Sequence, residues 1–489
     1  MLNKWKQTIS KFVCFVLTCQ LFILTVWAKP DWPSDTGIMA EAGIVMDMDS
    51  GAILYGQNIH LTYPPASITK ILTALIVLEN CNLDDTVTFS TTAVNQVEAD
   101  SGNKISVVAG DELSVEDCLY SMLLVSCNQA ANALAEHTAG SISAFVNMMN
   151  EKLAQLGCQE SHFENPSGLN GDNQYVSAYD MALIAQAAYD NETLVEISSA
   201  TTHKIAPTTQ NPDGFTIRGE HRLCVTEDPS SPYYYPEAVA GKTGYLIKAG
   251  NTLVTYAVKD NRRLISVILK GQPRQYFVDG KALLEFGFRS FQDYTVADYE
   301  SRYVTGNETI NLDKGSFQAS DLMIDPDSVI TLPNSASFED ADITLGALPE
   351  ISPDNAVALL TYSYNDRTIG TAYLLAKDGV TIDGNDSAAE AATTAFDTAN
   401  AEAPLATAFN AEKPQRPHKH ISVAGVLITI LIVLLVLGVI GLISWFIYSK
   451  KKEAKALAKR RERRRQRLQR SGDEEEFERL LAEYKNKKK

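Results

Sequence analysis

Residues 64–78 read PPASITKILTALIVL, and this stretch predicts a helix over Ser67–Leu78 with a serine and a lysine on its first turn. Apolar side chains recur every three or four residues from Ile71 to Leu78, which predicts that one face is buried in a core. Ser67 lies where the positive end of the helix dipole favours a developing negative charge. Lys70 follows three residues later on the same face, so its amine can reach Ser67 Oγ. The alternative is an exposed serine that caps the helix beside an unrelated lysine.

A lysine amine beside a serine becomes a base only if its pKa falls from about 10.4 towards neutrality. That is a shift of about 3 pKa units, or about 4 kcal/mol. Burial of the amine and a second cation nearby would both lower the pKa. The sequence therefore predicts that Lys70 is buried and lies close to another basic residue.

Two further motifs follow along the chain. Ser126-Cys127-Asn128 comes after the apolar run Met122–Val125, and Lys242-Thr243-Gly244 precedes strand-like sequence. Each triplet alone is weakly specific. In this order, however, the S-x-x-K, S-x-N and K-T-G motifs match the set found in penicillin-binding proteins and β-lactamases. The ordered set predicts acyl transfer through a serine nucleophile.

Longer stretches of the chain resemble the D-alanyl-D-alanine carboxypeptidase family. They are Pro64–Thr73, Glu164–Leu169, Tyr179–Ala182 and Leu283–Phe288, and the resemblance covers roughly Glu41–Ala376. It implies an α/β fold like that of β-lactamases and DD-peptidases, with an antiparallel sheet flanked by helices and a helical subdomain. It also implies a serine-type carboxypeptidase that removes the terminal D-alanine from peptidoglycan pentapeptides and that β-lactam antibiotics acylate.

The resemblance assigns catalytic roles to residues of the first two motifs. Ser67 would be the acylated nucleophile, and Lys70 would be its general base. Ser126 would relay the proton to the departing D-alanine, while Asn128 would hold the substrate backbone.

The same resemblance assigns substrate binding to the third motif and its surroundings. Lys242 would add positive field that lowers the pKa of Lys70, and Thr243, next to Gly244, would bind the terminal carboxylate of the substrate. The backbone N–H groups of Ser67 and Tyr245 would form the oxyanion hole. Arg274 is a further candidate for the carboxylate, and an ordinary surface arginine is the alternative reading.

The chain departs from the family pattern at three places. Leu246 stands two residues after the motif glycine, where the family usually has a threonine. His221-Arg222 replaces an asparagine-containing stretch. Neither change removes a catalytic group, but both could alter which peptides fit. Family members often end in an amphipathic surface helix, whereas this chain has an apolar run and a basic tail.

Residues 1–28 are typical of a secretory signal peptide. Three lysines precede an apolar run from Phe12 to Trp27, and the small residue Ala28 stands before Lys29-Pro30. The alternative is a membrane anchor that is not cleaved. In either case the bulk of the chain is expected outside the cytoplasm.

A second apolar run, at 421–448, is long enough to cross a bilayer as one transmembrane helix. Lysines and arginines cluster from Lys450 to Arg465, which predicts that the tail at 449–489 is cytoplasmic. The sequence thus predicts a single-pass protein of the bacterial cell membrane with an extracytoplasmic catalytic domain. The basic tail could bind anionic lipids or serve only as a stop-transfer signal.

Between these segments the sequence divides into a catalytic domain at 29–288, a β-rich domain at 289–378 and a disordered linker at 379–420. The first domain is expected to contain hairpins at Ala42–Tyr55 and Thr252–Leu269 and helices at Ser114–His137, Ser143–Leu156 and Tyr179–Tyr189. The second domain is expected to be small and all-β, and its clearest hairpin lies at Ala356–Leu375.

Charge and cysteine content exclude several classes of partner. The formal net charge is −17, although residues 450–489 hold 17 basic and 8 acidic residues, so the exported body is strongly acidic. Such a surface argues against binding nucleic acid. The cysteines beyond the signal peptide are odd in number and lack C-x-x-C spacing, and the seven histidines are scattered. We therefore expect no disulfide framework, no metal site and no cofactor.

Two alternatives belong to other functional classes. A β-lactamase shares the three motifs but also needs a water positioned by a glutamate, for which Glu164 lies in a plausible stretch. A sensor of wall peptides or β-lactams would be acylated at Ser67 without releasing the product. The second domain and the expected anchor favour a wall-bound peptidase over a β-lactamase. Against the sensor, the tail has only about forty residues and no folded-domain pattern, and the intact set of motifs argues for turnover.

Overall fold

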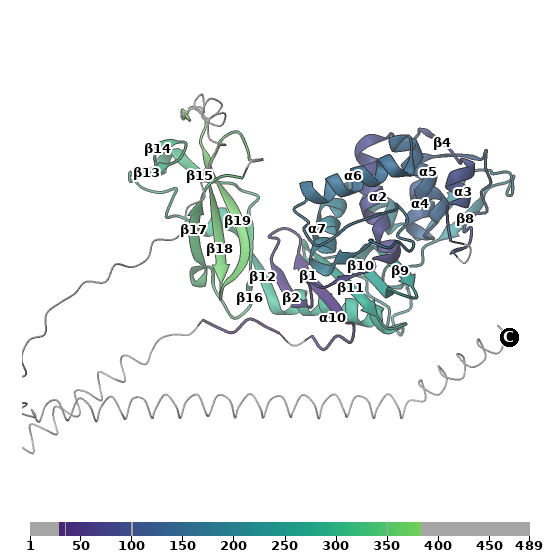
Figure 1. Ribbon diagram of the computed structural model, residues 1–489. Coiled ribbons are helices and arrows are strands. Elements are labelled where there is room, and N and C mark those ends of the chain that lie inside the picture. The colour runs from purple at the N-terminus through teal and green to yellow at the C-terminus, as the bar shows by residue number, and fades with distance from the viewer. Residues whose placement is uncertain (1–28, 35, 99–100, 350, 383–489) are drawn as a thin grey trace, which may run out of the picture. The chain divides into compact units, whose positions relative to one another are not determined.

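The structure, a computed structural model, describes residues 29–34, 36–98, 101–349 and 351–382, and its centre is a five-stranded antiparallel sheet (Figure 1). The strand order is β2-β1-β11-β10-β9. The strands are β1 (Ala42–Asp47), β2 (Ile53–Gln57), β9 (Ala238–Leu246), β10 (Gly250–Lys259) and β11 (Arg262–Gly271). Both hairpins expected from the sequence are present. Asp260 and Asn261 join β10 to β11 with φ of 49° and 66°, as a tight two-residue turn requires.

Side chains of the strands alternate between two cores, one on each face of the sheet. On β1, Ile44 and Met46 belong to the larger core, which the helical subdomain completes. Val45 belongs to the opposite core, where it joins Leu283 and Leu284. These leucines lie on α10 (Gln275–Ser290), and Figure 1 shows α7 and α10 on opposite faces of the sheet. The fold therefore has the expected layers of helix, sheet and helix.

The helical subdomain is built from one long inserted segment between β2 and β9. Its main helices are α2 (Lys70–Asn80), α4 (Val115–Leu124), α5 (Asn128–Ala139), α6 (Ile142–Gln155), α7 (Ala178–Tyr189) and α8 (Glu192–Ser199), with the short α3 (Thr91–Asn95) and α9 (Arg222–Val225). Pairs of short strands connect them: β3 (Thr62–Tyr63) with β6 (Val176–Ser177), β4 (Thr86–Thr88) with β5 (Glu112–Ser114), and β7 (Thr202–Ile205) with β8 (Phe215–Arg218). The predicted helices at Ser143–Leu156 and Tyr179–Tyr189 correspond to α6 and α7.

The single helix predicted over Ser114–His137 is wrong. Its start is correct, because Ser114 Oγ accepts a hydrogen bond of 3.0 Å from Asp117 N–H. The chain then breaks between α4 and α5, where Ser126 has φ of 61°. Cys127 begins the next helix, and its Sγ accepts from Ala130 N–H at 3.4 Å. The apolar spacing runs on across the break, so periodicity alone did not reveal it.

The β-rich domain follows α10 and has its own apolar core. Its four-stranded sheet has the order β15-β19-β18-β17, and two further sheets have two strands each: β12 pairs with β16, and β13 pairs with β14. The strands are β12 (Phe291–Thr295), β13 (Thr309–Leu312), β14 (Gly315–Gln318), β15 (Leu322–Ile324), β16 (Val329–Pro333), β17 (Asp342–Gly346), β18 (Ala356–Tyr364) and β19 (Arg367–Ala376). The short helix α11 (Val296–Tyr299) follows β12. Buried Tyr362 and Leu360 contribute to the core, and the hairpin predicted at Ala356–Leu375 is confirmed as β18 and β19.

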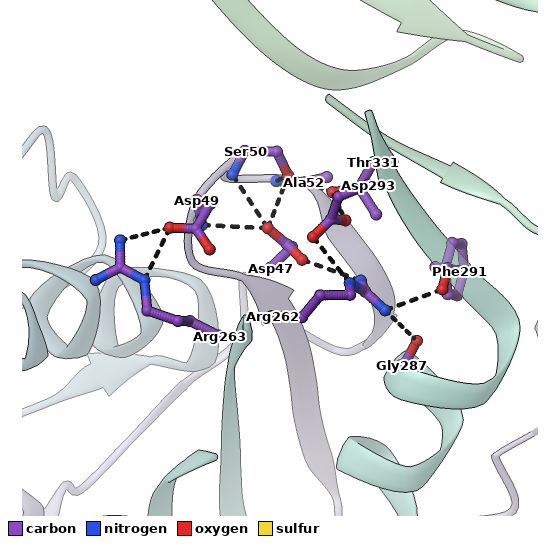
Figure 2. Close-up of polar contacts among 10 residues, drawn as sticks. All are labelled: Asp47, Asp49, Ser50, Ala52, Arg262, Arg263, Gly287, Phe291, Asp293 and Thr331. Carbon is purple, nitrogen blue, oxygen red and sulfur yellow. Dashed lines mark hydrogen bonds and ion pairs between the residues drawn. The ribbon is translucent and has the colours of Figure 1, made fainter. Parts of the chain in front are cut away.

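A polar junction joins this domain to the central sheet (Figure 2). Arg262 lies between two carboxylates, at 3.0 Å from Asp47 and 2.8 Å from Asp293. Ser50 Oγ and Thr331 Oγ1 share a further hydrogen bond of 2.7 Å. Burial and the neighbouring Asp293 raise the pKa of Asp47 to about 7, and Arg262 opposes them. The Arg262 guanidinium therefore balances the negative charges of two carboxylates at a site with little access to water.

The signal peptide, the linker from residue 383, the apolar run and the basic tail lie outside the described residues. Within the described part of the chain, no helix is both long and apolar enough to cross a membrane.

Removing the charge of Arg262 should destabilise the protein. Arg262→Met leaves Asp47 buried beside Asp293 without a cation, and we expect a loss of about 3–5 kcal/mol, measured as a lower midpoint of thermal unfolding. The matched control is Arg263→Met at the next position, where a side chain that is 35% exposed pairs with Asp49 and Asp190. That change should cost about 1 kcal/mol or less. Equal losses for the two variants would contradict the importance of the junction.

Candidate active site

Ser67 lies on a tight turn directly before the first long helix. The sequence predicted an α-helix from Ser67, but residues Ala66–Thr69 form a 3₁₀ turn and α2 begins only at Lys70. Ala66 has φ of 53°, and Thr69 Oγ1 donates back to Ala66 O at 2.9 Å. Side chains three residues apart eclipse each other on such a turn. Ser67 and Lys70 therefore face each other more directly than on an α-helix.

Lys70 is fully buried, and three oxygen atoms surround its amine. Nζ lies 3.0 Å from Ser67 Oγ and 2.7 Å from Asn128 Oδ1, and it also contacts Ser167 O. A neutral amine has two N–H groups and one lone pair. With the N–H groups on Asn128 and Ser167, the lone pair can accept the Ser67 hydroxyl proton. The protonated amine satisfies the same three oxygens with three N–H groups, so the site accommodates both states.

The electrostatic surroundings of Lys70 favour the neutral amine. Its pKa is lowered well below the usual value, first by burial and then by the positive charge of Lys242, with Cys127 acting weakly in the other direction. Burial in turn raises the pKa of the Cys127 thiol to about 11, so this thiol stays protonated at neutral pH. Lys70 is thus a plausible proton acceptor for Ser67.

Ser126 and Asn128 approach from the break between α4 and α5. Ser126 is partly exposed and holds a left-handed backbone, a conformation that disfavours side chains and is common at functional sites. Asn128 is the first residue of α5 and is 6% exposed. Because its Oδ1 accepts from Lys70, only the Nδ2 amide is left for a substrate. The helix break that the sequence failed to predict places Asn128 at the start of α5, where its side chain contacts Lys70, and it places Ser126 two residues before it.

The third motif lies on β9, the edge strand of the sheet. Lys242 is 1% exposed, and its Nζ donates to Thr243 O at 2.9 Å. Burial lowers the pKa of Lys242 to about 8, Glu220 raises it and Lys104 lowers it. Strand β9 packs directly against the nucleophile turn, since a Cβ on Gly244 would lie 2.8 Å from Ser67 N. Thr252 Oγ1 on β10 fixes the same turn by donating to Pro65 O at 2.9 Å.

The remaining predicted binding residues lie at the rim of this arrangement. Thr243 is partly exposed on β9, and Tyr245 is 63% exposed just beyond it. Arg274 lies on the surface at the start of α10. Among the described residues no hydrogen bond or ion pair joins it to the other candidates, and its role stays a prediction.

Sequence reasoning missed a backbone carbonyl, that of Ser167. The loop that carries it is held by Asn165 Oδ1, which accepts from Gly168 N–H at 2.8 Å, and by Thr73 Oγ1, which donates to Pro166 O at 2.7 Å. The stretch Glu164–Leu169 signalled the family resemblance but offered no side chain for this role. A carbonyl contact depends on loop conformation, which residue type does not reveal.

Glu164 does not face the nucleophile. Its Oε2 accepts from Asn173 N–H at 3.1 Å within its own loop, and Ser167 O rather than a carboxylate contacts Lys70. Glu164 is therefore engaged within its own loop, and this geometry does not favour the β-lactamase alternative, which needs a glutamate that positions a water.

His221, one of the departures from the family pattern, is buried behind the strands that carry the third motif. Its Nε2 lies 3.2 Å from both Val254 O and Thr255 Oγ1. Burial is the main reason that the pKa of His221 falls to about 4, so the imidazole is neutral at neutral pH. His221 therefore supports the backbone beside Lys242 and is not placed to touch a substrate.

The close packing of Gly244 against the nucleophile turn gives a test. In Gly244→Ala the new methyl group would lie 2.4 Å from Thr252 Oγ1 and 2.8 Å from Ser67 N, so the turn or the strand must move. We expect acylation of Ser67 by fluorescent penicillin to slow by about 10²-fold, as small displacements of reacting groups do. Gly346→Ala is the control, since its methyl group would meet only Leu359 O at 3.7 Å. Unchanged acylation in the folded Gly244 variant would contradict this packing.

Comparisons with known proteins agree with this geometry. The sequence profile of the D-alanyl-D-alanine carboxypeptidase family, Peptidase_S11, matches residues 29–272. D-alanyl-D-alanine carboxypeptidase DacB2 of Mycobacterium tuberculosis is 34% identical over 265 residues, which cover 53% of this chain and 84% of that protein. DacF of Bacillus subtilis is 29% identical over 281 residues, which cover 56% of this chain and 69% of that protein.

A crystal structure of the D-alanyl-D-alanine carboxypeptidase from M. tuberculosis H37Rv aligns with a TM-score of 0.46 and 31% identity, over 54% of this chain and 94% of that chain. The region matched by the family profile includes every segment that surrounds the Lys70 amine. Since the chain also spans most of DacB2, it belongs to the D-alanyl-D-alanine carboxypeptidase family of serine peptidases.

Proposed function

We propose that this protein removes the terminal D-alanine from peptidoglycan pentapeptides through an acyl-enzyme on Ser67. One observation carries the proposal most directly: Ser67 Oγ lies 3.0 Å from the amine of a fully buried lysine. The positive charge of Lys242 lies close enough to lower the pKa of that amine further. Membership of the carboxypeptidase family supplies the substrate class.

In the acylation step, Ser67 Oγ attacks the carbonyl carbon of the D-Ala–D-Ala peptide bond, and its proton passes to Lys70 Nζ. The negative charge that develops on the carbonyl oxygen would be stabilised by the backbone N–H groups of Ser67 and Tyr245. The close approach of β9 to the nucleophile turn at Gly244 supports this assignment, because it brings the two N–H groups near each other.

The C–N bond then breaks, and the leaving amine takes a proton through the Ser126 hydroxyl. Free D-alanine departs, and the shortened peptide remains as an ester on Ser67. Lys70, neutral again, removes a proton from a water that attacks this ester, and the serine is released. The strained turn at Ser126 supports the relay role, since it places this residue two positions before Asn128, which contacts Lys70.

In this proposal, residues of the edge strand β9 recognise the substrate carboxylate. Lys242 supplies positive charge, and the hydroxyl of Thr243 supplies a hydrogen bond. Arg274 is the weaker candidate, because it lies on the surface in this structure. A β-lactam carries a similar carboxylate and a strained carbonyl in place of the scissile bond. We therefore expect β-lactams to acylate Ser67.

We also propose that the protein is held in the bacterial cell membrane with its active site outside. The support is in the sequence alone: an apolar run at 421–448 followed by a cluster of lysines and arginines. In this proposal residues 1–28 direct export, 379–420 form a tether, and the tail at 449–489 remains in the cytoplasm, where anionic lipids could bind it.

The first experiment compares the full-length protein with its Ser67→Ala variant. We expect the wild type to be labelled by fluorescent penicillin and to release D-alanine from a D-Ala–D-Ala peptide, while the variant does neither. Labelling without D-alanine release would favour the sensor alternative. Rapid loss of the label with intact peptide substrate would favour a β-lactamase. A folded wild type that is not labelled would refute the assignment of Ser67.

The acylation rate should fall on both sides of a pH optimum, which gives its pH profile an acidic limb and an alkaline limb. Lys70 must be neutral to accept the proton, so the rate should fall when pH drops below its lowered pKa. Lys242 must be charged to attract the carboxylate, so the rate should fall above its pKa of about 8, by about tenfold at one pH unit higher. In Lys242→Arg the guanidinium does not titrate in this range, and the alkaline limb should disappear. An unchanged alkaline limb in that variant would rule out Lys242 as its source.

A further inference from the structure

An ion pair that has no part in the mechanism above lies next to the active-site segments. Lys104 Nζ lies 3.2 Å from Glu220 Oε1, and both side chains are nearly half exposed. Lys104 belongs to the segment between α3 and β5, and Glu220 to the segment between β8 and α9. The two residues are thus distant in sequence and meet only in the folded protein.

Two hydrogen bonds attach the segments that carry this pair to the two sides of the turn at Ser126. Glu220 N–H donates to Leu124 O at 3.1 Å, just before the turn. On the other side, Gln129 Nε2 donates to Gly102 O at 3.2 Å, just after it. The two segments that carry the ion pair are therefore attached to the two ends of the helix break.

The same residues are held close to Lys242. His221 follows Glu220, and its imidazole bonds to Val254 O, the residue opposite Lys242 in the β9–β10 ladder. A Cβ on Gly241 would lie 2.7 Å from His221 Nε2. Lys242 itself makes no ion pair among the described residues. The negative charge of Glu220 favours the charged Lys242 amine, and the positive charge of Lys104 acts against it.

We propose that Glu220 and Lys104 are positioning residues for Lys242. Glu220 keeps the Lys242 amine charged over the working range of the enzyme. Lys104 neutralises Glu220, so that this carboxylate does not repel the carboxylate of the substrate. The inference rests on the proposed function, since it assumes that charged Lys242 attracts that carboxylate.

The other titratable groups facing Lys242 do not supply this control. His221 is uncharged near neutral pH because its pKa is about 4, and the Cys127 thiol is uncharged because its pKa is about 11. Lys70 from α2 is neutral in the reactive state. Glu220 and Lys104 are therefore the groups whose charge persists next to Lys242 when the enzyme reacts.

The test measures the second-order rate of Ser67 acylation by fluorescent penicillin from pH 6 to pH 10 in the full-length protein. Glu220→Gln removes the supporting negative charge, and the alkaline limb should move to lower pH by about 0.5–1 unit. Lys104→Gln leaves Glu220 unpaired, and the limb should move to higher pH by a similar amount. In that variant the rate at pH 7 should also fall by about three- to tenfold, because the free carboxylate repels the penicillin carboxylate.

Matched controls separate this electrostatic role from a structural one. Glu79→Gln and Lys152→Gln break a comparable pair between α2 and α6, 2.7 Å apart, and should leave both limbs in place. Glu220→Asp keeps the charge and should keep the alkaline limb near its wild-type position even if the rate falls. A structural defect would lower the rate without moving the limb in opposite directions.

Opposite shifts in Glu220→Gln and Lys104→Gln, with unmoved limbs in the controls, would support the inference. Shifts in the same direction, or shifts no larger than those of the controls, would overturn it and leave the proposed function standing. Failure of the wild type to be labelled would overturn the proposed function, and this inference with it.

Discussion

Two buried lysines that, among the residues the structure describes, make no ion pair with a carboxylate constrain this active site more than any other feature. Lys70 and Lys242 are almost fully removed from water, and the positive charge of Lys242 lowers the pKa of Lys70. A desolvated ammonium group is strongly unfavourable unless it loses its proton or gains oxygen acceptors. Within the described part of the chain, oxygen acceptors but no carboxylate contact the Lys70 amine, so the neutral form of this amine is favoured. The chemistry proposed for Ser67 follows from this one electrostatic conflict.

The segments around Lys70 carry the unusual backbone conformations of the site. Ala66 precedes the nucleophile with φ of 53°, Ser126 has φ of 61°, and Gly168 follows the carbonyl with φ of 80°. Such conformations cost about 1–3 kcal/mol each for residues with a side chain and persist only where surrounding contacts hold them. Each segment has such a contact: Thr252 bonds to Pro65, Cys127 caps α5, and Asn165 bonds to Gly168. These strained segments hold three oxygen atoms around the Lys70 amine.

Sequence reasoning succeeded where a pattern repeats and failed where one residue breaks it. The hairpins of β1–β2, β10–β11 and β18–β19 follow from alternating apolar residues and turn residues, and the structure has them. The break at Ser126 was missed because the apolar spacing continues from α4 into α5. The Ser167 carbonyl was missed because every residue has one. The Lys104–Glu220 pair joins loops whose distance no local pattern encodes, so only the fold reveals it.

The β-rich domain contacts the central sheet at the end opposite the active site. Arg262, which binds it at the junction, is the first residue of β11, and Gly271 at the other end of that strand pairs with Asn251, the partner of Tyr245. A strand of this length spans about 30 Å. The junction and the active site thus lie at opposite ends of one stiff sheet, and none of the residues around Lys70 comes from β12–β19. The groups that contact Lys70 are therefore set by the nucleophile turn and the helical subdomain, and the β-rich domain contributes none of them.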